Sequence, residues 1–183
     1  LAGELFEELG AIVVDSDQLS RDVIERGTPG FDEVLENFGD AILTDGAIDR
    51  KKLGEIVFKD SAKRLILEKI VHPRVREAFN RVVEAAGENA IIINQIPLLV
   101  ETDGSKNFDS VITVSAPVEI RRERLLKRGL KSYEIENRMA AQVSDGEREA
   151  IAEFIIDNSG DEFALQSQVE NIYRDLKSRA YGN

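Results

Sequence analysis

The chain has no cysteine and no tryptophan, and it has one histidine and one methionine among its 183 residues. Without cysteine, it can form neither a disulfide framework nor a thiolate nucleophile. A single histidine disfavours a His-rich metal site and a Ser-His-Asp triad. The sequence therefore lies outside the disulfide-rich, thiol-dependent and histidine-rich classes of protein.

Positive charge is also scarce. The chain has 24 Lys and Arg against 35 Asp and Glu, which gives a net charge of −11. This balance excludes a broad basic footprint for nucleic acid and a polybasic patch for membranes. No apolar run approaches the roughly 18 residues that a membrane span needs, and no signal peptide is visible. We expect a soluble, cytoplasmic protein that binds neither nucleic acid nor membrane.

Short apolar runs alternate with helical segments along the chain. The pattern predicts strands over residues 11–14, 90–96, 110–114 and 154–156. Strands separated by helices favour an α/β fold with a parallel sheet that is covered on both faces. Residues 18–86 and 118–153 are longer than a simple crossover needs. We expect them to be excursions from one domain, residues 1–183, that hold a substrate domain and a lid.

A proline divides the first of these excursions. The residue before proline disfavours the helical conformation, so we expect a helix to end near His72-Pro73 and another to span residues 74–86. The start of a helix carries partial positive charge, and Arg76 would add a full charge in the first turn. This segment could therefore hold an anion, and the alternative is that His-Pro marks only a helix boundary.

An acidic pair closes the first predicted strand, where Asp15 and Asp17 follow the apolar run of residues 11–14. Ligands of open α/β sheets bind outside the carboxyl ends of the strands. Side chains alternate along an extended segment, so the two carboxylates would point the same way. One could accept a proton from a hydroxyl while the other holds a metal-bound water or a cation. The alternative is that one of them caps the following helix.

The predicted helix over residues 118–128 carries five cations within residues 121–128. Arg121, Arg124 and Arg128 share one face, and their planar guanidinium groups suit a polyphosphate. With the acidic strand end, this face fits phosphoryl transfer, which depends on positioning and charge stabilisation. The alternative is a solvated helix with internal ion pairs, Glu119–Arg122 and Glu123–Lys127.

Two further segments follow predicted strands. Pro97-Leu98-Leu99-Val100-Glu101 forms an apolar ledge with a carboxylate beside it. The alternative is that this ledge belongs to the core. Asn158, after the last predicted strand, either borders a base pocket or turns the chain.

Ten short motifs occur in order along essentially the whole chain: VVDSDQLSR (13–21), GTP (27–29), FG (38–39), DGAIDR (45–50), VF (57–58), HPRVR (72–76), IPLLVE (96–101), ERLLKR (123–128), AAQ (140–142) and IDNSG (156–160). This ordered set resembles the dephospho-coenzyme A kinase family. The resemblance implies a three-layer parallel-sheet P-loop kinase fold with a helical CoA-binding insert at residues 18–86 and a helical lid at residues 124–145. It implies ATP-dependent, Mg²⁺-dependent phosphorylation of the 3′-hydroxyl of dephospho-CoA, which gives coenzyme A and ADP.

The resemblance also implies roles for individual residues. Asp17 would accept the proton of the 3′-hydroxyl, and Arg124 would stabilise the transferring phosphoryl group. Arg128 would lie in the lid near the nucleotide phosphates, and no residue is implied as a metal ligand. Asn158 is a further candidate for a nucleotide contact, which the resemblance does not itself imply. The residues implied for dephospho-CoA are Arg21, Arg76, Pro97, Leu98 and Leu99.

One family motif is missing from the sequence, the Walker A loop G-x-x-x-x-G-K-[ST]. The residues from Leu1 to Leu9 already read as a helix, so we expect a strand and this loop in roughly 15–20 residues ahead of Leu1. Two alternatives follow. One is another small-molecule P-loop kinase, adenylate-kinase-like, since the long insert disfavours a shikimate kinase. The other is a catalytically dead CoA-binding module, if the loop is truly absent.

Overall fold

The computed structural model describes residues 1–102, 104–140 and 142–182. It divides into two compact units: the first comprises Leu1–Val13 and Ile96–Asn183, and the second comprises Val14–Gln95. The second unit contains all of the predicted insert, residues 18–86. Asp103 lies outside the described residues, as does Ala141 of the AAQ motif.

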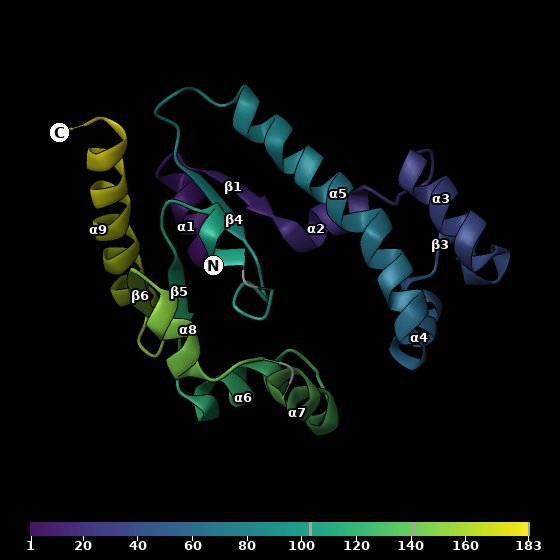
Figure 1. The fold of residues 1–183 in the computed structure, drawn as a ribbon. Helices are drawn as coiled ribbons and strands as arrows, with labels where there is room; N and C mark the ends of the chain where they lie inside the picture. Colours follow the sequence, from purple (N-terminus) through teal and green to yellow (C-terminus); the bar gives the residue numbers. More distant parts are fainter. Residues whose placement is uncertain (103, 141, 183) are drawn as a thin grey trace. The chain divides into compact units, whose positions relative to one another are not determined.

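The first unit contains a pair of parallel strands flanked by helices (Figure 1). Strands β5 and β6 pair in register from Ile112↔Phe154 to Ser115↔Asp157, which confirms the predicted mixture of helices and parallel strands. The elements are α1 (Ala2–Glu8), η2 (Gly104–Asn107), β5 (Ile112–Ser115), α6 (Val118–Lys127), α7 (Ser132–Ala140), α8 (Asp145–Ile151), β6 (Phe154–Asp157) and α9 (Glu162–Ala180).

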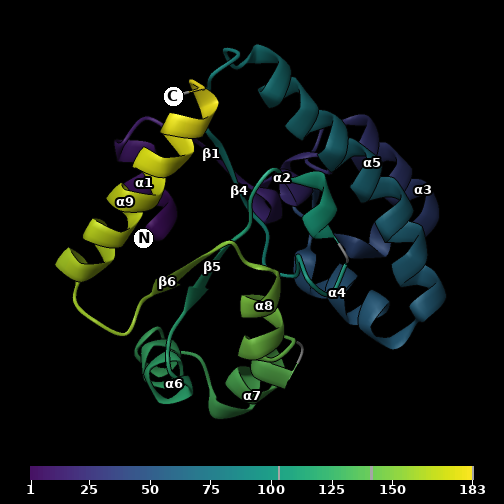
Figure 2. The same ribbon diagram turned by 60° about the vertical axis from the view of Figure 1, so that its left-hand side comes forward.

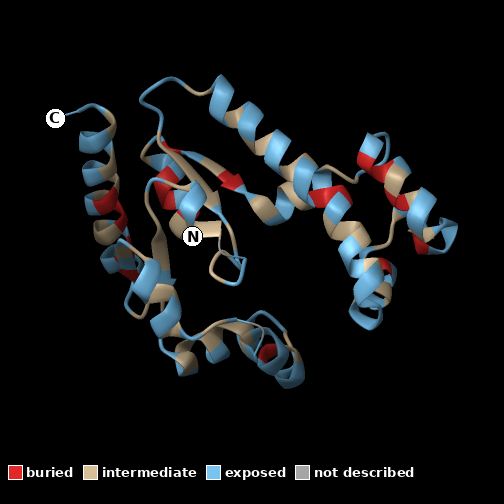
Figure 3. Cartoon of the chain, in the orientation of Figure 1, coloured by how far each residue is buried: buried red, intermediate tan, exposed pale blue. Residues whose placement is uncertain are grey.

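Helix α9 packs against α1 and against β6, and α1 and α9 lie side by side in both ribbon views (Figures 1 and 2). Its apolar residues recur at helical spacing, and Leu165, Val169 and Ile172 are buried (Figure 3). Phe6 of α1 and Ile156 of β6 are buried as well. The apolar face of this last helix therefore covers the strand whose end carries Asn158.

The second unit is mostly helical. Strand β1 begins in the first unit and ends here, beside β4 in a two-stranded sheet. Strands β2 and β3 form an antiparallel hairpin around Asp45 and Gly46, whose φ angles of 53° and 77° suit a two-residue turn. The elements are β1 (Ile12–Asp15), α2 (Ser16–Asp22), α3 (Pro29–Phe38), η1 (Asp40–Ile42), β2 (Leu43–Thr44), β3 (Ala47–Ile48), α4 (Arg50–Lys59), α5 (Ser61–Ala85) and β4 (Ile92–Gln95).

The core of the second unit lies where α3, η1, α4 and α5 meet. Val34, Ile42, Leu53 and Ile70 are buried there, and partly buried apolar side chains surround them. This core fixes α5, and α5 packs in turn against α2, the helix that follows the acidic strand end. No helix in the described part of the chain is long and apolar enough to cross a membrane.

Helix α5 corrects one prediction. It runs without a break from Ser61 to Ala85, with Pro73 in its interior, so no helix ends near His72-Pro73. Proline removes one backbone N–H from the helix ladder, but packing against α2, α3 and α4 keeps the segment helical. The guanidinium of Arg74 donates to the carbonyl oxygen of Ile70 at 2.8 Å in this turn.

Candidate functional site

The two acidic residues Asp15 and Asp17 occupy different positions at the start of α2. Asp15 is the N-cap of α2, and its Oδ1 accepts hydrogen bonds from the backbone N–H of Asp17 (2.8 Å) and of Gln18 (3.2 Å). The capping alternative is therefore confirmed for Asp15. Asp17 lies in the first turn of α2. The expectation that both carboxylates follow the alternation of one extended segment is wrong, because the helix begins at Ser16.

Asp17 is exposed, and its carboxylate has no hydrogen-bond or ion-pair partner among the described residues of its unit. Its backbone is well anchored on both sides. Its N–H donates to Asp15, and the hydroxyl of Ser16 donates to Oδ1 of Asn94 in β4 at 2.7 Å. The chain thus fixes the backbone of Asp17 and leaves its carboxylate available for a proton or a ligand.

Two arginines of the second unit have side chains that are similarly available. Arg21 lies four residues after Asp17 on α2, hence on the same face of that helix. Arg76 lies on α5, which packs against α2. Both side chains are exposed, and neither has a partner among the described residues of the unit.

The helix-start argument for an anion site at residues 72–76 is wrong. Arg76 lies in the interior of α5, so no free backbone N–H groups of a helix terminus accompany its charge. The neighbouring Arg74 is not available either, because it forms an ion pair with Glu33 at 2.5 Å. That Arg76 binds dephospho-CoA therefore stays a prediction, which rests on the family resemblance and on the exposed charge of Arg76.

The arginine helix of the first unit, α6, ends at Lys127, and Arg128 is its C-cap. Arg121 forms an ion pair with Asp145 at 2.6 Å, and Nη1 of Arg124 donates to the backbone oxygen of Asn158 at 2.8 Å. Arg128 is exposed and has no partner in the described part of this unit. Of the three arginines predicted on one face, two are held by the protein and one is available.

Of the two ion pairs expected within α6, Glu123–Lys127 is confirmed and Glu119–Arg122 is wrong. Glu123 and Lys127 pair within α6 at 2.6 Å, and the hydrogen bond from Lys127 lowers the pKa of Glu123. Arg122, however, pairs with Glu136 at 2.7 Å and not with Glu119. The reason is tertiary, because α7 packs against α6 and brings a carboxylate from another helix to Arg122.

The end of β6 is built from main-chain and side-chain hydrogen bonds. The carboxylate of Asp157 accepts from the backbone N–H of Ser159 at 2.8 Å, and hydrogen bonds from the hydroxyl and the N–H of Ser159 lower the pKa of Asp157. The N–H of Asn158 donates to the oxygen of Ser115 at 2.7 Å. Asn158 thus contributes its backbone to the position of Arg124, and a nucleotide contact of its side chain stays a prediction.

The predicted apolar ledge follows β4 as a turn rather than as core. Pro97 is exposed and Leu98 is 42 % exposed, whereas Leu99 is partly buried. Glu101, the carboxylate beside the ledge, accepts a hydrogen bond from the backbone N–H of Val143 at 2.9 Å. The ledge therefore presents two apolar side chains to solvent, and its acidic end is tied to the segment that precedes α8.

Helix α8 carries a carboxylate, Asp145, whose arginine partners the sequence did not predict. Asp145 forms ion pairs with both Arg121 and Arg148. Ser144 and Glu147 form a capping box at the start of this helix. The S-x-x-E spacing is a sequence signal for such a start, but it does not indicate which arginines the next carboxylate meets.

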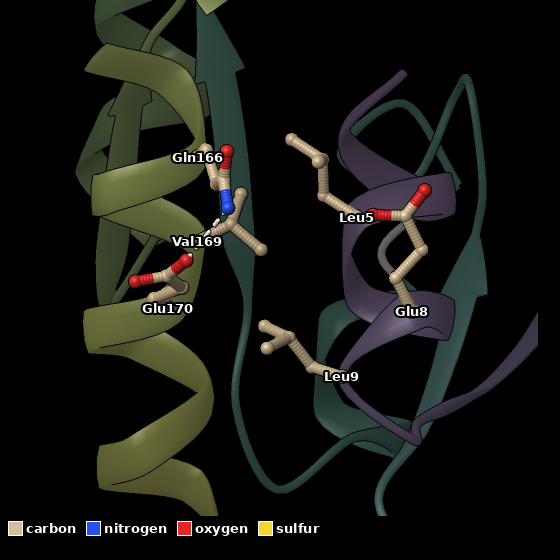
Figure 4. A pocket seen from close by; sticks show the side chains of 6 residues that line it. All are labelled: Leu5, Glu8, Leu9, Gln166, Val169 and Glu170. Atoms are coloured by element: carbon tan, nitrogen blue, oxygen red, sulfur yellow. Dashed lines mark hydrogen bonds between the residues drawn. The ribbon is translucent and has the colours of Figure 1, made fainter. Parts of the chain in front are cut away.

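A small groove lies between α1 and α9 in the first unit (Figure 4). Its volume of about 30 Å³ is the room of a single water molecule, and no predicted site residue lines it. The hydrogen bond from Gln166 to Glu170 crosses one wall at 2.8 Å. The groove therefore does not serve as the nucleotide site. Its lining residues are Leu5, Glu8, Leu9, Gln166, Val169 and Glu170.

Comparison with known proteins decides the family. The family model described as CoaE, dephospho-CoA kinase, matches residues 1–163. The chain belongs to the dephospho-CoA kinase family. A dephospho-CoA kinase of Thermobifida fusca is 41% identical over 174 residues, which cover 94% of this chain and 87% of that protein. The predicted family is thereby confirmed, and with it the predicted class of ATP-dependent kinase.

Solved structures agree with this assignment. The crystal structure of TT1252 from Thermus thermophilus has a TM-score of 0.83 at 28% identity and covers 94% of this chain and 88% of its own. A dephospho-CoA kinase from Campylobacter jejuni has a TM-score of 0.69 at 24% identity, covers 97% of this chain and 92% of its own, and shows the fold alone. The predicted α/β fold with parallel strands is confirmed at this level.

Proposed function

We propose that this protein transfers the γ-phosphoryl group of ATP to the 3′-hydroxyl of dephospho-CoA, which gives coenzyme A and ADP. The family match over residues 1–163 carries this proposal. The side chains of the two units support it, since an available carboxylate and exposed arginines occur in one unit and an arginine helix occurs in the other. Phosphoryl transfer depends mainly on such positioning and charge stabilisation.

Asp17 is proposed as the proton acceptor. As the 3′-oxygen of the ribose bonds to the γ-phosphorus, the bond from that phosphorus to the bridging oxygen of ADP breaks, and the hydroxyl proton passes to the Asp17 carboxylate. Asp15 is less suited to this role because its carboxylate is held as the N-cap of α2, where Oδ1 accepts from two backbone N–H groups. Asp17 has no such partners in its unit, so its oxygens can accept the substrate hydroxyl.

Arg124 is proposed to stabilise the transferring phosphoryl group. Its Nη1 is fixed on the oxygen of Asn158, and a guanidinium has five N–H donors in a rigid plane. The remaining donors can bind two phosphoryl oxygens in that fixed orientation. Arg128, which has no partner in the described part of its unit, is proposed to bind the nucleotide phosphates, and Asn158 is proposed to border the nucleotide.

The dephospho-CoA side is proposed to combine charge with apolar surface. Exposed Arg21 and Arg76 can pair with the diphosphate of the substrate, and the ledge of Pro97, Leu98 and Leu99 can contact its apolar arm. Residues 18–86 are proposed as the CoA-binding insert and residues 124–145 as a lid of a three-layer kinase fold. The helical content of both segments supports this assignment.

Mg²⁺ is proposed as a companion of ATP. In the described residues, no three His, Cys, Asp or Glu side chains form a group that could hold a metal ion by itself. A magnesium ion on a nucleotide needs only one or two protein carboxylates, because phosphates and water complete its shell. No step above is assigned to a protein ligand of this ion.

The direct test is ADP release by the protein expressed from its own start codon, with ATP, Mg²⁺ and one candidate acceptor at a time. We expect turnover with dephospho-CoA and little with AMP or shikimate, and mass spectrometry of the product should show one added phosphoryl group. Turnover with AMP or shikimate alone would contradict the proposal. Tight binding of dephospho-CoA by calorimetry without any turnover would make the protein a CoA-binding module.

A further inference from the structure

Helix α8, Asp145–Ile151, is a short helix of the first unit. Its side chains contact two other elements of that unit, strand β5 and helix α6. Its Glu149 accepts a hydrogen bond from the hydroxyl of Ser115, at the end of β5, at 2.9 Å. Its Asp145 forms an ion pair with Arg121 of α6 at 2.6 Å. Helix α8 thus connects the carboxyl end of the parallel strands with the arginine helix.

The contact with Asp145 fixes the orientation of α6. Arg121 and Arg124 are three residues apart and therefore lie on one face of the helix. Arg121 is attached to Asp145, and Arg124 is attached to the oxygen of Asn158 after β6. Two attachments one turn apart fix the rotation of a helix about its axis, which a single attachment does not.

The attachment depends on the charge of Asp145. Its carboxylate accepts from both Arg121 and Arg148, whose side chains are only 24% and 18% exposed. The Nε atoms of both arginines are buried and have no hydrogen-bond partner among the described residues. Largely buried guanidinium groups that share one carboxylate repel each other once that charge is removed. Neutralising Asp145 should therefore displace Arg121 and, with it, the face of α6.

We propose that Asp145 is a positioning residue for phosphoryl transfer. Through Arg121 it sets the rotation of α6, so that Arg124 keeps its guanidinium at the end of β6 with donors left for the phosphoryl group. Asp145 itself need not touch substrate. This inference rests on the proposed function of Arg124.

The test begins with Asp145→Asn in the protein expressed from its own start codon, which removes the charge and keeps the size of the side chain. We expect kcat to fall by roughly 10- to 100-fold, the loss that follows a small misplacement of a catalytic group. KM for dephospho-CoA should change by less than about threefold, since ground-state binding is not altered. Asp145→Glu should restore part of kcat.

The matched control is Glu153→Gln. Glu153 also accepts from an arginine, Arg179 at 2.5 Å, in the same unit but at the opposite end of β6. This variant likewise loses an ion pair between elements, and it should keep the kcat of the wild type. Equal kcat values for the two variants would overturn the inference.

A double-mutant cycle separates positioning from general damage. If Asp145 acts through Arg124, Asp145→Asn should cause no further loss of kcat in an Arg124→Ala background. The same fold-loss in both backgrounds would overturn the inference, because a merely structural effect does not need Arg124. Should Asp145→Asn not fold, Arg121→Lys is the second variant, since it keeps the charge and loses the planar fork; its effect on kcat should also vanish with Arg124→Ala.

The position of the Arg124 side chain can also be measured without enzyme activity, so that the role of Asp145 is tested separately from the proposed function. The ¹⁵N NMR signal of the Arg124 Nε–H, assigned by its loss in Arg124→Ala, should shift in Asp145→Asn and not in Glu153→Gln. An unshifted signal would overturn the inference even in an active enzyme. Absence of dephospho-CoA phosphorylation by the wild type would instead overturn the proposed function, whatever this signal shows.

Discussion

The charged side chains predicted for the site differ between the two units in whether other residues of the unit hold them by hydrogen bonds or ion pairs. In the first unit, Arg121 and Arg124 have protein partners that fix their guanidinium groups. In the second unit, Asp17, Arg21 and Arg76 have none within that unit in the described part of the chain. Fixed donors suit charge that develops in a transition state, because no reorganisation is needed at that moment. Unpartnered groups suit a ligand or a proton that arrives from outside.

The largest expected effect tests the unpartnered carboxylate. Asp17→Asn should lower kcat by roughly 10²- to 10⁴-fold, the contribution of a general base, and leave the affinity for dephospho-CoA nearly unchanged. Initial rates of ADP release give kcat, and calorimetry gives Kd. The matched variant is Asp15→Asn, which retains a capping side chain and should lower kcat much less. Near-normal turnover of Asp17→Asn would show that the carboxylate is not the proton acceptor.

Arg124→Ala tests the fixed arginine. Loss of a preorganised donor should lower kcat by roughly 10²- to 10³-fold with a small change in KM. Arg124→Lys should restore little, because one ammonium group cannot hold the oxygen of Asn158 and two phosphoryl oxygens together. The control is Arg122→Ala on the same helix, whose partner is Glu136. An equal loss in the control would indicate damage to α6 rather than loss of a catalytic group.

Arg21→Ala and Arg76→Ala test the unpartnered cations. Each should raise KM for dephospho-CoA by roughly 10- to 150-fold, since a hydrogen bond to a charged group contributes about 1.5–3 kcal/mol, and leave kcat within a fewfold. The effect should shrink with added salt, because exposed charges are screened. Arg64→Ala is the control on α5, where Arg64 only pairs with Glu68 at 3.6 Å. A loss of kcat without a change in KM would remove these arginines from the substrate side.

The fold could be predicted wherever local chemistry decides it. Thr28 before Pro29 is a local signal for a helix start, and the structure shows Thr28 as the N-cap of α3. Pro73 predicted a boundary that does not exist, because the packing of α5 against three helices outweighs the loss of one backbone hydrogen bond. Such packing brings together residues distant in sequence, and a local pattern carries no information about it.

The candidate site could likewise be predicted where local spacing decides it and not where tertiary contacts decide it. The Asp-x-Asp spacing indicated a functional strand end, but it could not tell whether the helix begins at Ser16 or later, and this decides which carboxylate is the cap. Helical spacing placed Arg121 and Arg124 on one face. Their partners, Asp145 and Asn158, lie 24 and 34 residues away in the sequence, so only the tertiary structure reveals them.

A smaller effect is expected on the free energy of unfolding, where the capping carboxylate of Asp15 can be compared with the carboxylate of Asp17. Asp15→Ala should lower the free energy of unfolding by about 1 kcal/mol, because two backbone N–H groups lose their acceptor. Asp17→Ala should change it less, since its carboxylate accepts no hydrogen bond within its unit. Urea unfolding followed by circular dichroism measures both. Equal losses would contradict the division of roles within the acidic pair.

The smallest effect concerns a fixed carboxylate away from the site. Hydrogen bonds from Ser110 and Arg179 lower the pKa of Glu153 from its ordinary value of 4.5. A carboxylate whose pKa is lower in the folded state stabilises the fold above that ordinary value, and this contribution disappears as the pH falls through the folded pKa. Glu153→Gln should therefore lower Tm slightly at pH 7, and its difference from the wild type should shrink as the pH falls below 4.5. A difference that stays constant as the pH falls would mean that packing, and not the charge of Glu153, maintains this contact with α9.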